Sequence, residues 1–309
     1  MPIPENMNIA PIALFVFNRL QHTRQSVEAL ANNELAVCSD LFVFSDGPRT
    51  EADSEHVESV RKYITSITGF KSVTVVARKA NLGCARSITS GISEVVNRYG
   101  RIIVVEDDIV TSPHFLRFMN EALEIYRNEE RVACIHGYLY PVGKALPETF
   151  FIKGADIWGW ATWKRGWDLF EPDGEKLLNA LNHQKLTSEF DFDGSFYFTS
   201  MLKAQIEGRL DTWDINWYAS AFLKDKLTLY PGKSLVKNIG NDNSGTHSNT
   251  TNKFDTDIST EPVRITRIPL EENQAAREAF KKFFRSLKPS LSERVLTRIN
   301  RMLNLNQLK

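Results

Sequence analysis

The sequence predicts an α/β fold with a mostly parallel sheet flanked by helices, and three observations support this prediction. Continuous apolar runs recur along the first hundred residues at intervals of roughly 30, the length of a βαβ unit. The segments between these runs carry apolar residues at helical spacing. The runs themselves lack polar alternation, which is typical of strands buried on both faces.

Four apolar runs are expected to be strands, and the amphipathic segments between them are expected to be helices. The expected strands are residues 12–17, 41–44, 73–77 and 102–105, and the expected helices are residues 23–31, 54–67 and 84–99. Gly100 follows the last of these helices and is a plausible terminating glycine. The second half is less regular, with a helix expected at 115–126 and strands at 131–138 and 150–152.

Composition excludes several classes of protein. The chain has 309 residues, of which 42% are apolar, and its 38 basic and 38 acidic residues balance to zero net charge. A disordered chain would be less apolar and more highly charged. Binding nucleic acid by bulk electrostatics requires a basic surplus, so no nucleic-acid partner is expected.

The cysteines and the N-terminal segment favour a cytoplasmic protein. Cys38, Cys84 and Cys134 lie far apart without Cys-x-x-Cys spacing, so neither a disulfide framework nor a zinc site is expected. Buried free thiols in a reducing compartment are the expectation. Residues 1–10 are polar and unlike a signal peptide, and no apolar run reaches the ~18 residues of a transmembrane helix.

Each of the four expected strands ends on a polar or charged group. The ends carry Asn18 and Arg19, then Asp46, then Arg78, and finally a run of three acids that starts at Glu106. In open α/β sheets, ligands bind beyond the carboxyl ends of the strands. A binding site along this edge is therefore expected.

The acidic run Glu106-Asp107-Asp108 is the sharpest feature of this edge. Three adjacent carboxylates repel one another and resist desolvation, and a divalent cation such as Mn²⁺ or Mg²⁺ would relieve both costs. Strand alternation would put Glu106 and Asp108 on one face and Asp107 on the other. The alternative is a solvated acidic turn that caps the helix after Pro113.

The stretch from Ile102 to Asp108, followed by Pro113-His114-Phe115, resembles the D-x-D region of GT-A nucleotide-sugar glycosyltransferases. It most resembles N-acetylglucosaminyltransferase I. It is also similar to bacterial family 2-type sugar transferases of surface-polysaccharide clusters, which begin with a strand, Asn-Arg and a later Ser-Asp-Gly-Pro. The resemblance spans roughly residues 11–248 and implies a GT-A (Rossmann-like) fold.

The resemblance implies a nucleotide-sugar site and a metal. The implied donor-binding residues are Asn18 and Arg19 at the nucleotide, Asp46 at the uracil ring, Arg78 and Arg86 near the donor cleft, and Glu106 and Asp107 at the ribose or donor sugar. Asp108 would ligate Mn²⁺ or Mg²⁺. For Asn18 and Asp46 the alternative is ordinary turn chemistry, which favours both residue types.

An acid between tryptophans is the candidate catalytic base. The stretch from Asp211 to Trp217 resembles the family's Trp-Asp-x-x-Trp-like segment, and an inverting transferase needs a base for the acceptor hydroxyl. Neighbouring tryptophans would desolvate Asp214 and raise its pKa. Asp211 is the alternative base, and an N-cap role in the helix from 215 to 223 is the structural alternative.

Two further segments are weaker candidates. Trp158 and Gly159 resemble the family's Gly-Trp segment that lines the sugars, with core packing as the alternative. His247 lies in the Gly/Asn/Ser-rich loop 238–252, where some GT-A enzymes supply a histidine to the metal or diphosphate. Simple solvation of this histidine is the alternative.

The C-terminal segment is basic and amphipathic. Residues 277–309 carry nine basic residues against Glu278 and Glu293, a net of +7, with apolar residues at helical spacing. Such a tail suits contact with an anionic membrane surface, or packing of a helix with a solvated basic face. We expect a catalytic domain over 1–260, with a nucleotide-binding half (1–110) and an acceptor-binding half (111–260), and a tail over 261–309.

Together these features predict a metal-dependent, inverting glycosyltransferase at the inner face of the cell membrane. The donor would be a UDP-sugar, and the acceptor a hydroxyl of a surface glycan or lipid-linked oligosaccharide. One alternative is a sugar-nucleotide nucleotidyltransferase, although no glycine-rich loop follows the first strand. The other is a non-catalytic glycan-binding or membrane-associated protein on the same fold.

Overall fold

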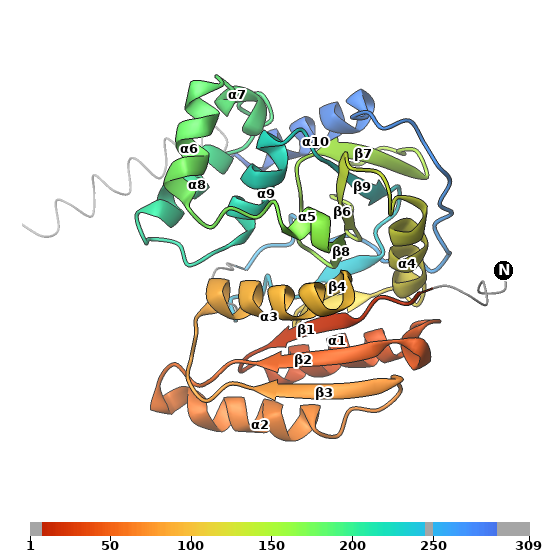
Figure 1. The fold of residues 1–309 in the computed structure, drawn as a ribbon, viewed down its shortest axis with the longest axis vertical. Coiled ribbons are helices and arrows are strands. Elements are labelled where there is room, and N and C mark those ends of the chain that lie inside the picture. Colours follow the sequence, from red (N-terminus) through yellow and green to blue (C-terminus); the bar gives the residue numbers. More distant parts are fainter. Residues whose placement is uncertain (1–7, 245–249, 289–309) are drawn as a thin grey trace, which may run out of the picture.

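The computed structural model describes residues 8–244 and 250–288. Within them, one sheet of eight strands has the order β3-β2-β1-β4-β8-β6-β9-β7, and helices cover both faces (Figure 1). Neighbouring strands from β3 to β4 are parallel, as are β6 and β9, whereas β8 and β7 are antiparallel to their neighbours. The predicted α/β class with a mostly parallel sheet is confirmed.

The elements alternate regularly at first and less regularly later. The strands of the large sheet are β1 (Ile12–Val16), β2 (Asp40–Ser45), β3 (Ser72–Ala77), β4 (Arg101–Glu106), β6 (Val132–His136), β7 (Thr149–Lys153), β8 (Trp160–Trp163) and β9 (Leu227–Pro231). The helices are α1 (Leu20–Ala31), α2 (Ser54–Ile64), α3 (Cys84–Tyr99), α4 (Phe115–Ile125), α5 (Lys164–Trp167), α6 (Gly174–His183), α7 (Thr187–Phe190), α8 (Phe198–Ile206), α9 (Asp214–Leu223) and α10 (Gln274–Leu287). Short β5 (Ile109–Thr111) and β10 (Val236–Asn238) form a separate antiparallel pair.

Strand β1 shows why the first runs lack polar alternation. Ile12, Leu14 and Val16 pack in the cluster that includes the apolar faces of α1, α2 and α4. Ala13 and Phe15 pack in the opposite cluster with α3. Both faces of this strand are therefore buried, and successive residues must all be apolar.

The prediction of two buried faces is wrong for β3. None of its six residues is fully buried, because β3 is the outermost strand and pairs only with β2. Its apolar run therefore reflects β propensity more than burial. The buried-thiol prediction is likewise wrong for Cys38, which lies on a surface 3-10 turn and is exposed, whereas Cys134 is buried and Cys84 is half-buried.

Strand β8 was not anticipated, because its Trp-rich sequence resembled a sugar-binding segment. It inserts between β4 and β6 and runs antiparallel to both. Trp160 is fully buried there, and its ring lies 5.7 Å from that of Trp213 and 5.8 Å from that of Trp217. These tryptophans form a packed cluster between β8 and α9, so core packing accounts for most of the tryptophan-rich region.

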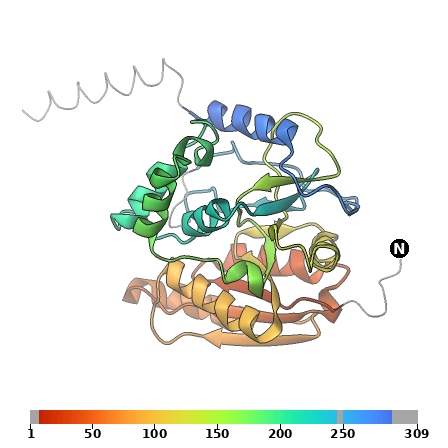
Figure 2. The same ribbon diagram turned by 45° about the horizontal axis from the view of Figure 1, so that its top comes forward.

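Helix α10 packs on the body of the molecule. Phe280, Phe283 and Phe284 are buried, and the ring of Phe280 lies 5.5 Å from that of Tyr230 on β9. Figures 1 and 2 place this helix at the end of the molecule opposite β3. Its apolar face is thus occupied by protein, and the rest of the predicted membrane-binding tail, residues 289–309, lies outside the described residues. Among the described helices, none is both long and apolar enough to cross a membrane.

Gly91 allows α3 to pack closely on the sheet. A Cβ at this position would lie 2.6 Å from the ring of Phe15, which stacks on Phe44 with ring centroids 5.1 Å apart. We expect Gly91→Ala to lower the free energy of unfolding by about 1–3 kcal/mol through overpacking. Asn97→Ala, at an exposed position of the same helix, should change it by less than about 0.5 kcal/mol in the same denaturant titration.

Candidate functional site

A cavity of ≈ 120 Å³ lies at the carboxyl ends of β1, β2 and β4, the edge at which a site was expected. Residues from both loops and helices contribute to its wall. Five predicted donor-site residues line it, namely Asn18, Arg19, Asp46, Glu106 and Asp107. The structure therefore brings together groups that lie up to 89 positions apart in the sequence.

Arg19 forms ion pairs with two carboxylates at this cavity. It precedes α1, and its Nη2 contacts Asp107 Oδ1 and lies 2.9 Å from Asp108 Oδ2. The predicted alternation of the acidic run is wrong beyond Glu106, because β4 ends there and Asp107 and Asp108 lie in a turn. Both turn carboxylates thereby reach the same guanidinium.

One N–H donor of Arg19, at Nη1, is not engaged by either aspartate. This Nη1 is buried and has no hydrogen-bond partner among residues 8–244 and 250–288. Burial opposes the charge of this guanidinium, but Asp107 and Asp108 outweigh burial and raise its pKa. The side chain is therefore a permanent cation with an N–H group available to an anion.

Burial disfavours the ionised forms of Glu106 and Asp107 in the cavity wall. Burial, and then the charges of Asp108 and Asp107, raise the pKa of Glu106 well above its usual range. Burial also raises the pKa of Asp107 to about 6, although Arg19 acts in the opposite direction. Such strain between neighbouring carboxylates is typical of functional sites.

Asp46 has a structural role as well as a place in the cavity wall. Its Oδ1 accepts 3.0 Å hydrogen bonds from the backbone N–H groups of Gly47 and Leu82. This contact ties the loop after β2 to the loop after β3. A Cβ on Gly47 would lie 2.5 Å from the backbone of Ala80, so only glycine allows the two loops to approach this closely.

Of the three arginines implied by the resemblance, only Arg19 lines the cavity. Arg78 donates a 2.9 Å hydrogen bond to Ser90 Oγ, Arg86 is exposed on α3, and neither lines the cavity. Arg49 and Asn81 line it instead. Sequence reasoning missed Arg49, although it directly follows the Ser-Asp-Gly-Pro turn, which was a usable signal.

The segment after β10 packs over Asp108. The backbone N–H of Ile239 donates a 2.8 Å hydrogen bond to the carbonyl oxygen of Asp108. A Cβ on Gly240 would lie 2.2 Å from Asp108 Oδ2, so this approach requires glycine. Ser244 lines the cavity, whereas the predicted ligand His247 lies outside the described residues.

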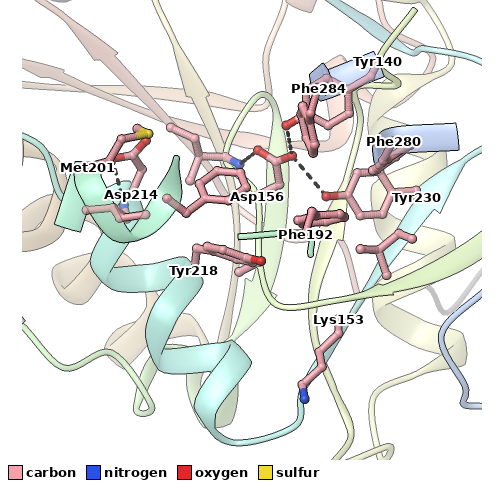
Figure 3. A pocket seen from close by; sticks show the side chains of 15 residues that line it. Tyr140, Lys153, Asp156, Phe192, Met201, Asp214, Tyr218, Tyr230, Phe280 and Phe284 are labelled. Atoms are coloured by element: carbon pink, nitrogen blue, oxygen red, sulfur yellow. Dashed lines mark hydrogen bonds between the residues drawn. The ribbon is translucent and has the colours of Figure 1, made fainter. Parts of the chain in front are cut away.

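Asp214 lies in the wall of a second cavity and does not line the first. The second cavity measures ≈ 60 Å³, and Asp214 forms part of its wall together with aromatic residues (Figure 3). Its charge also contributes to the raised pKa of Glu106, which lines the first cavity. Burial raises the pKa of Asp214 itself, while its Oδ1 accepts hydrogen bonds from Thr212 Oγ1 and, at 2.8 Å, from the N–H of Ile215.

Asp211 and the predicted sugar-lining pair lie elsewhere. Asp211 is exposed, and its Oδ2 accepts a 3.1 Å hydrogen bond from the N–H of Cys84, the first residue of α3. The backbone N–H of Trp158 donates a 3.1 Å hydrogen bond to His136 Nε2, and the indole ring of Trp158 packs on Tyr138. Neither Trp158 nor Gly159 lines either cavity.

Fold and site together define an α/β protein with a charged cavity at the carboxyl edge of a mostly parallel sheet. No family model matches the chain, and a search of curated proteins finds no match. Among solved structures, it is similar to the mannosyltransferase PcManGT from Pyrobaculum calidifontis in complex with GDP-Man and Mn²⁺ (9% identity, 72% of each chain, TM-score 0.39).

Two other solved structures are similar over part of the chain. One is UDP-glucose pyrophosphorylase complexed with UDP-glucose, with 11% identity over 72% of this chain and 90% of that chain, at a TM-score of 0.36. The other is TarS from S. aureus, with 13% identity over 47% of this chain and a TM-score of 0.31; the match spans 24% of TarS. These structures do not confirm the closer likeness to N-acetylglucosaminyltransferase I.

The free-energy cost of ionising the buried Glu106 can be measured through the pH dependence of stability. Its folded-state pKa is raised, so the native state binds more protons than the unfolded state and stability falls as pH rises from ~4.5 toward the folded pKa. Glu106→Gln removes this penalty. We therefore expect the Tm of the variant to exceed that of the wild type, by a margin that grows as the pH rises above ~4.5 toward the folded-state pKa.

The control is Glu58→Gln, at an exposed position on α2. Its Tm difference from wild type should stay constant over the same range. A margin for Glu106→Gln that shrinks with rising pH would show that Glu106 is stabilised as a carboxylate.

Proposed function

We propose that the protein is a metal-dependent glycosyltransferase of the GT-A type. It transfers a sugar from a nucleotide diphosphate, a UDP-sugar by its sequence resemblance, to a hydroxyl of a glycan or lipid-linked acceptor. The observation that carries this proposal is the cavity at the carboxyl ends of the strands, which gathers Arg19, Glu106 and Asp107 in one wall. The similarities to solved structures are too distant to argue for an activity.

The first cavity is the donor site in this proposal. A nucleotide diphosphate requires positive groups for its charge and directed hydrogen bonds for its base and ribose. Arg19 supplies a buried Nη1–H that no described residue engages, and Arg49 supplies a second guanidinium in the wall. Asn18, Asp46 and Asn81 supply polar groups in the same wall.

The carboxylates beside Arg19 fit a hard divalent cation. Asp107 and Asp108 already converge on one positive centre, the guanidinium of Arg19. Among the described residues, no group of three or more His, Cys, Asp and Glu side chains could hold a metal. Asp108, with Asp107 close by, would therefore hold the ion together with the donor's phosphates, as is usual for Mg²⁺. When bound, the metal neutralises charge on the leaving diphosphate.

Asp214 is the general base in this proposal. The acceptor hydroxyl gives its proton to the carboxylate, and its oxygen bonds to the anomeric carbon as the bond from that carbon to the diphosphate breaks. This direct displacement inverts the anomeric centre. A pKa raised by burial brings the carboxylate closer to the operating pH and makes it a better base.

A panel of UDP-sugars tests the activity as a whole. We expect at least one to be hydrolysed slowly in the presence of Mn²⁺, with release of UDP and loss of turnover on adding chelator. Release of UTP from a UDP-sugar and pyrophosphate would identify a nucleotidyltransferase instead. No turnover and no binding of any sugar nucleotide would overturn the proposal in favour of a non-catalytic protein.

The metal assignment is tested at Asp108. We expect Asp108→Ala to abolish the Mn²⁺-dependent part of UDP-sugar binding measured by calorimetry, because the carboxylate that would hold the ion is lost. Asp168→Ala, which removes an exposed carboxylate on the surface, should leave this binding unchanged. Unchanged metal-dependent binding by Asp108→Ala would contradict the assignment.

The base assignment is tested by comparing two aspartates three positions apart. We expect Asp214→Asn to lower kcat by about 10²–10⁴-fold while donor affinity is retained. Asp211→Asn should lower kcat far less, because Asp211 contacts the start of α3. The reverse order of effects would make Asp211 the base.

A further inference from the structure

The second cavity is an aromatic chamber with an acid at its wall. Its lining includes Tyr140, Tyr218, Tyr230 and Phe284, which come from the loop after β6, from α9, from β9 and from α10. Figure 3 shows these rings gathered around Asp156. The sequence analysis did not single out this aspartate.

Asp156 is held in position by three hydrogen bonds. Its Oδ2 accepts from the hydroxyls of Tyr140 at 2.8 Å and Tyr230 at 3.0 Å, and its Oδ1 accepts from the N–H of Ile157 at 2.8 Å. Its side chain is 18% exposed, so the carboxylate is fixed at the wall and still reaches the cavity. These neutral donors stabilise the carboxylate without cancelling its charge.

In the described part of the chain, no lysine or arginine forms an ion pair with Asp156 or Asp214. The guanidinium of Arg277 lies 4.8 Å from the ring centroid of Phe192 in the chamber wall, but it is paired with Glu272 at 3.3 Å and with Asp193 at 3.5 Å. Lys153 contributes to the lining, but its ammonium lies 3.0 Å from Glu189 and 3.4 Å from Asp225, pointing away from Asp156 (Figure 3). The nearest titratable cation is His136 at 3.7 Å, and burial lowers its pKa.

Aromatic faces beside a fixed carboxylate are the arrangement that binds organic cations. A ring attracts a cation through its quadrupole, more strongly where water is excluded. The volume of ≈ 60 Å³ would hold about four to six waters at roughly 10–15 Å³ each. This is room for a compact substituent, while the bulk of a larger ligand would stay outside.

We infer that the second cavity binds an organic ammonium group, and that the acceptor of the proposed transfer carries one. This inference rests on the proposed function only in naming the acceptor; the binding itself requires no donor. The chamber then selects an amino-substituted sugar over its neutral counterpart. Asp156 is a specificity-determining residue, distinct from the base Asp214 in the same wall.

The test is calorimetric titration of the full chain, without donor, with D-glucosamine, D-glucose and choline. We expect D-glucosamine to bind saturably and D-glucose to bind at least about tenfold more weakly. We expect Asp156→Asn to weaken D-glucosamine binding by about tenfold or more, and the exposed Asp168→Asn to leave it unchanged. Choline binding as well would show that the chamber accepts any compact ammonium ion; its failure would assign recognition to an amino sugar.

Equal affinity for D-glucosamine and D-glucose, or no binding of either amine, would overturn the inference. A melting curve would show whether Asp156→Asn folds. If it does not fold, the comparison of D-glucosamine with D-glucose on the wild-type protein tests the inference by itself. Because these titrations contain no donor, absence of sugar transfer would overturn the proposed function and leave the ammonium site standing. The converse result would remove only the ammonium site.

Discussion

The contact of Arg19 with Asp107 and Asp108 is the constraint on which this site depends. A sheet that ends on three consecutive acids must neutralise part of their charge, since burial raises the pKa of the first two and their mutual repulsion adds to it. The first strand supplies the cation, because its parallel pairing with β4 brings both carboxyl ends to the same edge. The electrostatics of the cavity are therefore a consequence of the topology of the sheet.

The fold was largely predictable because burial on both faces dictates the apolar character of strands such as β1, and because β propensity gives β3 a similar run. Strand β1 is apolar at every position since each of its faces meets a layer of helices, and this leaves a clear sequence signal. Strand β8 gave no such signal, because four residues between two antiparallel neighbours show neither length nor alternation. Residues 160–163 form a strand because they pair with β4 and β6, which lie far away in the sequence, and a local sequence pattern carries no information on such pairing.

The candidate site divides in the same way. One cavity is shared by Asn18, Arg19, Asp46, Glu106 and Asp107, because each lies at the carboxyl end of a parallel strand, which the order of elements already implies. Asp156 could not have been found, since its tyrosine partners lie 16 and 74 positions away. Arg78 shows a further limit: being at the right edge does not decide whether a side chain turns toward the cavity or, as here, toward Ser90.

Helix α10 closes the hydrophobic cluster over β7 and β9, and two of its phenylalanines, Phe280 and Phe284, also form a wall of the aromatic chamber. The same two side chains therefore contribute both to the stability of the fold and to the shape of the ligand site. A change that reshapes the chamber from this side also disturbs the packing that holds the helix in place. We conclude that new ligand preferences in this protein would evolve more readily through the loop that carries Asp156 than through its C-terminal helix.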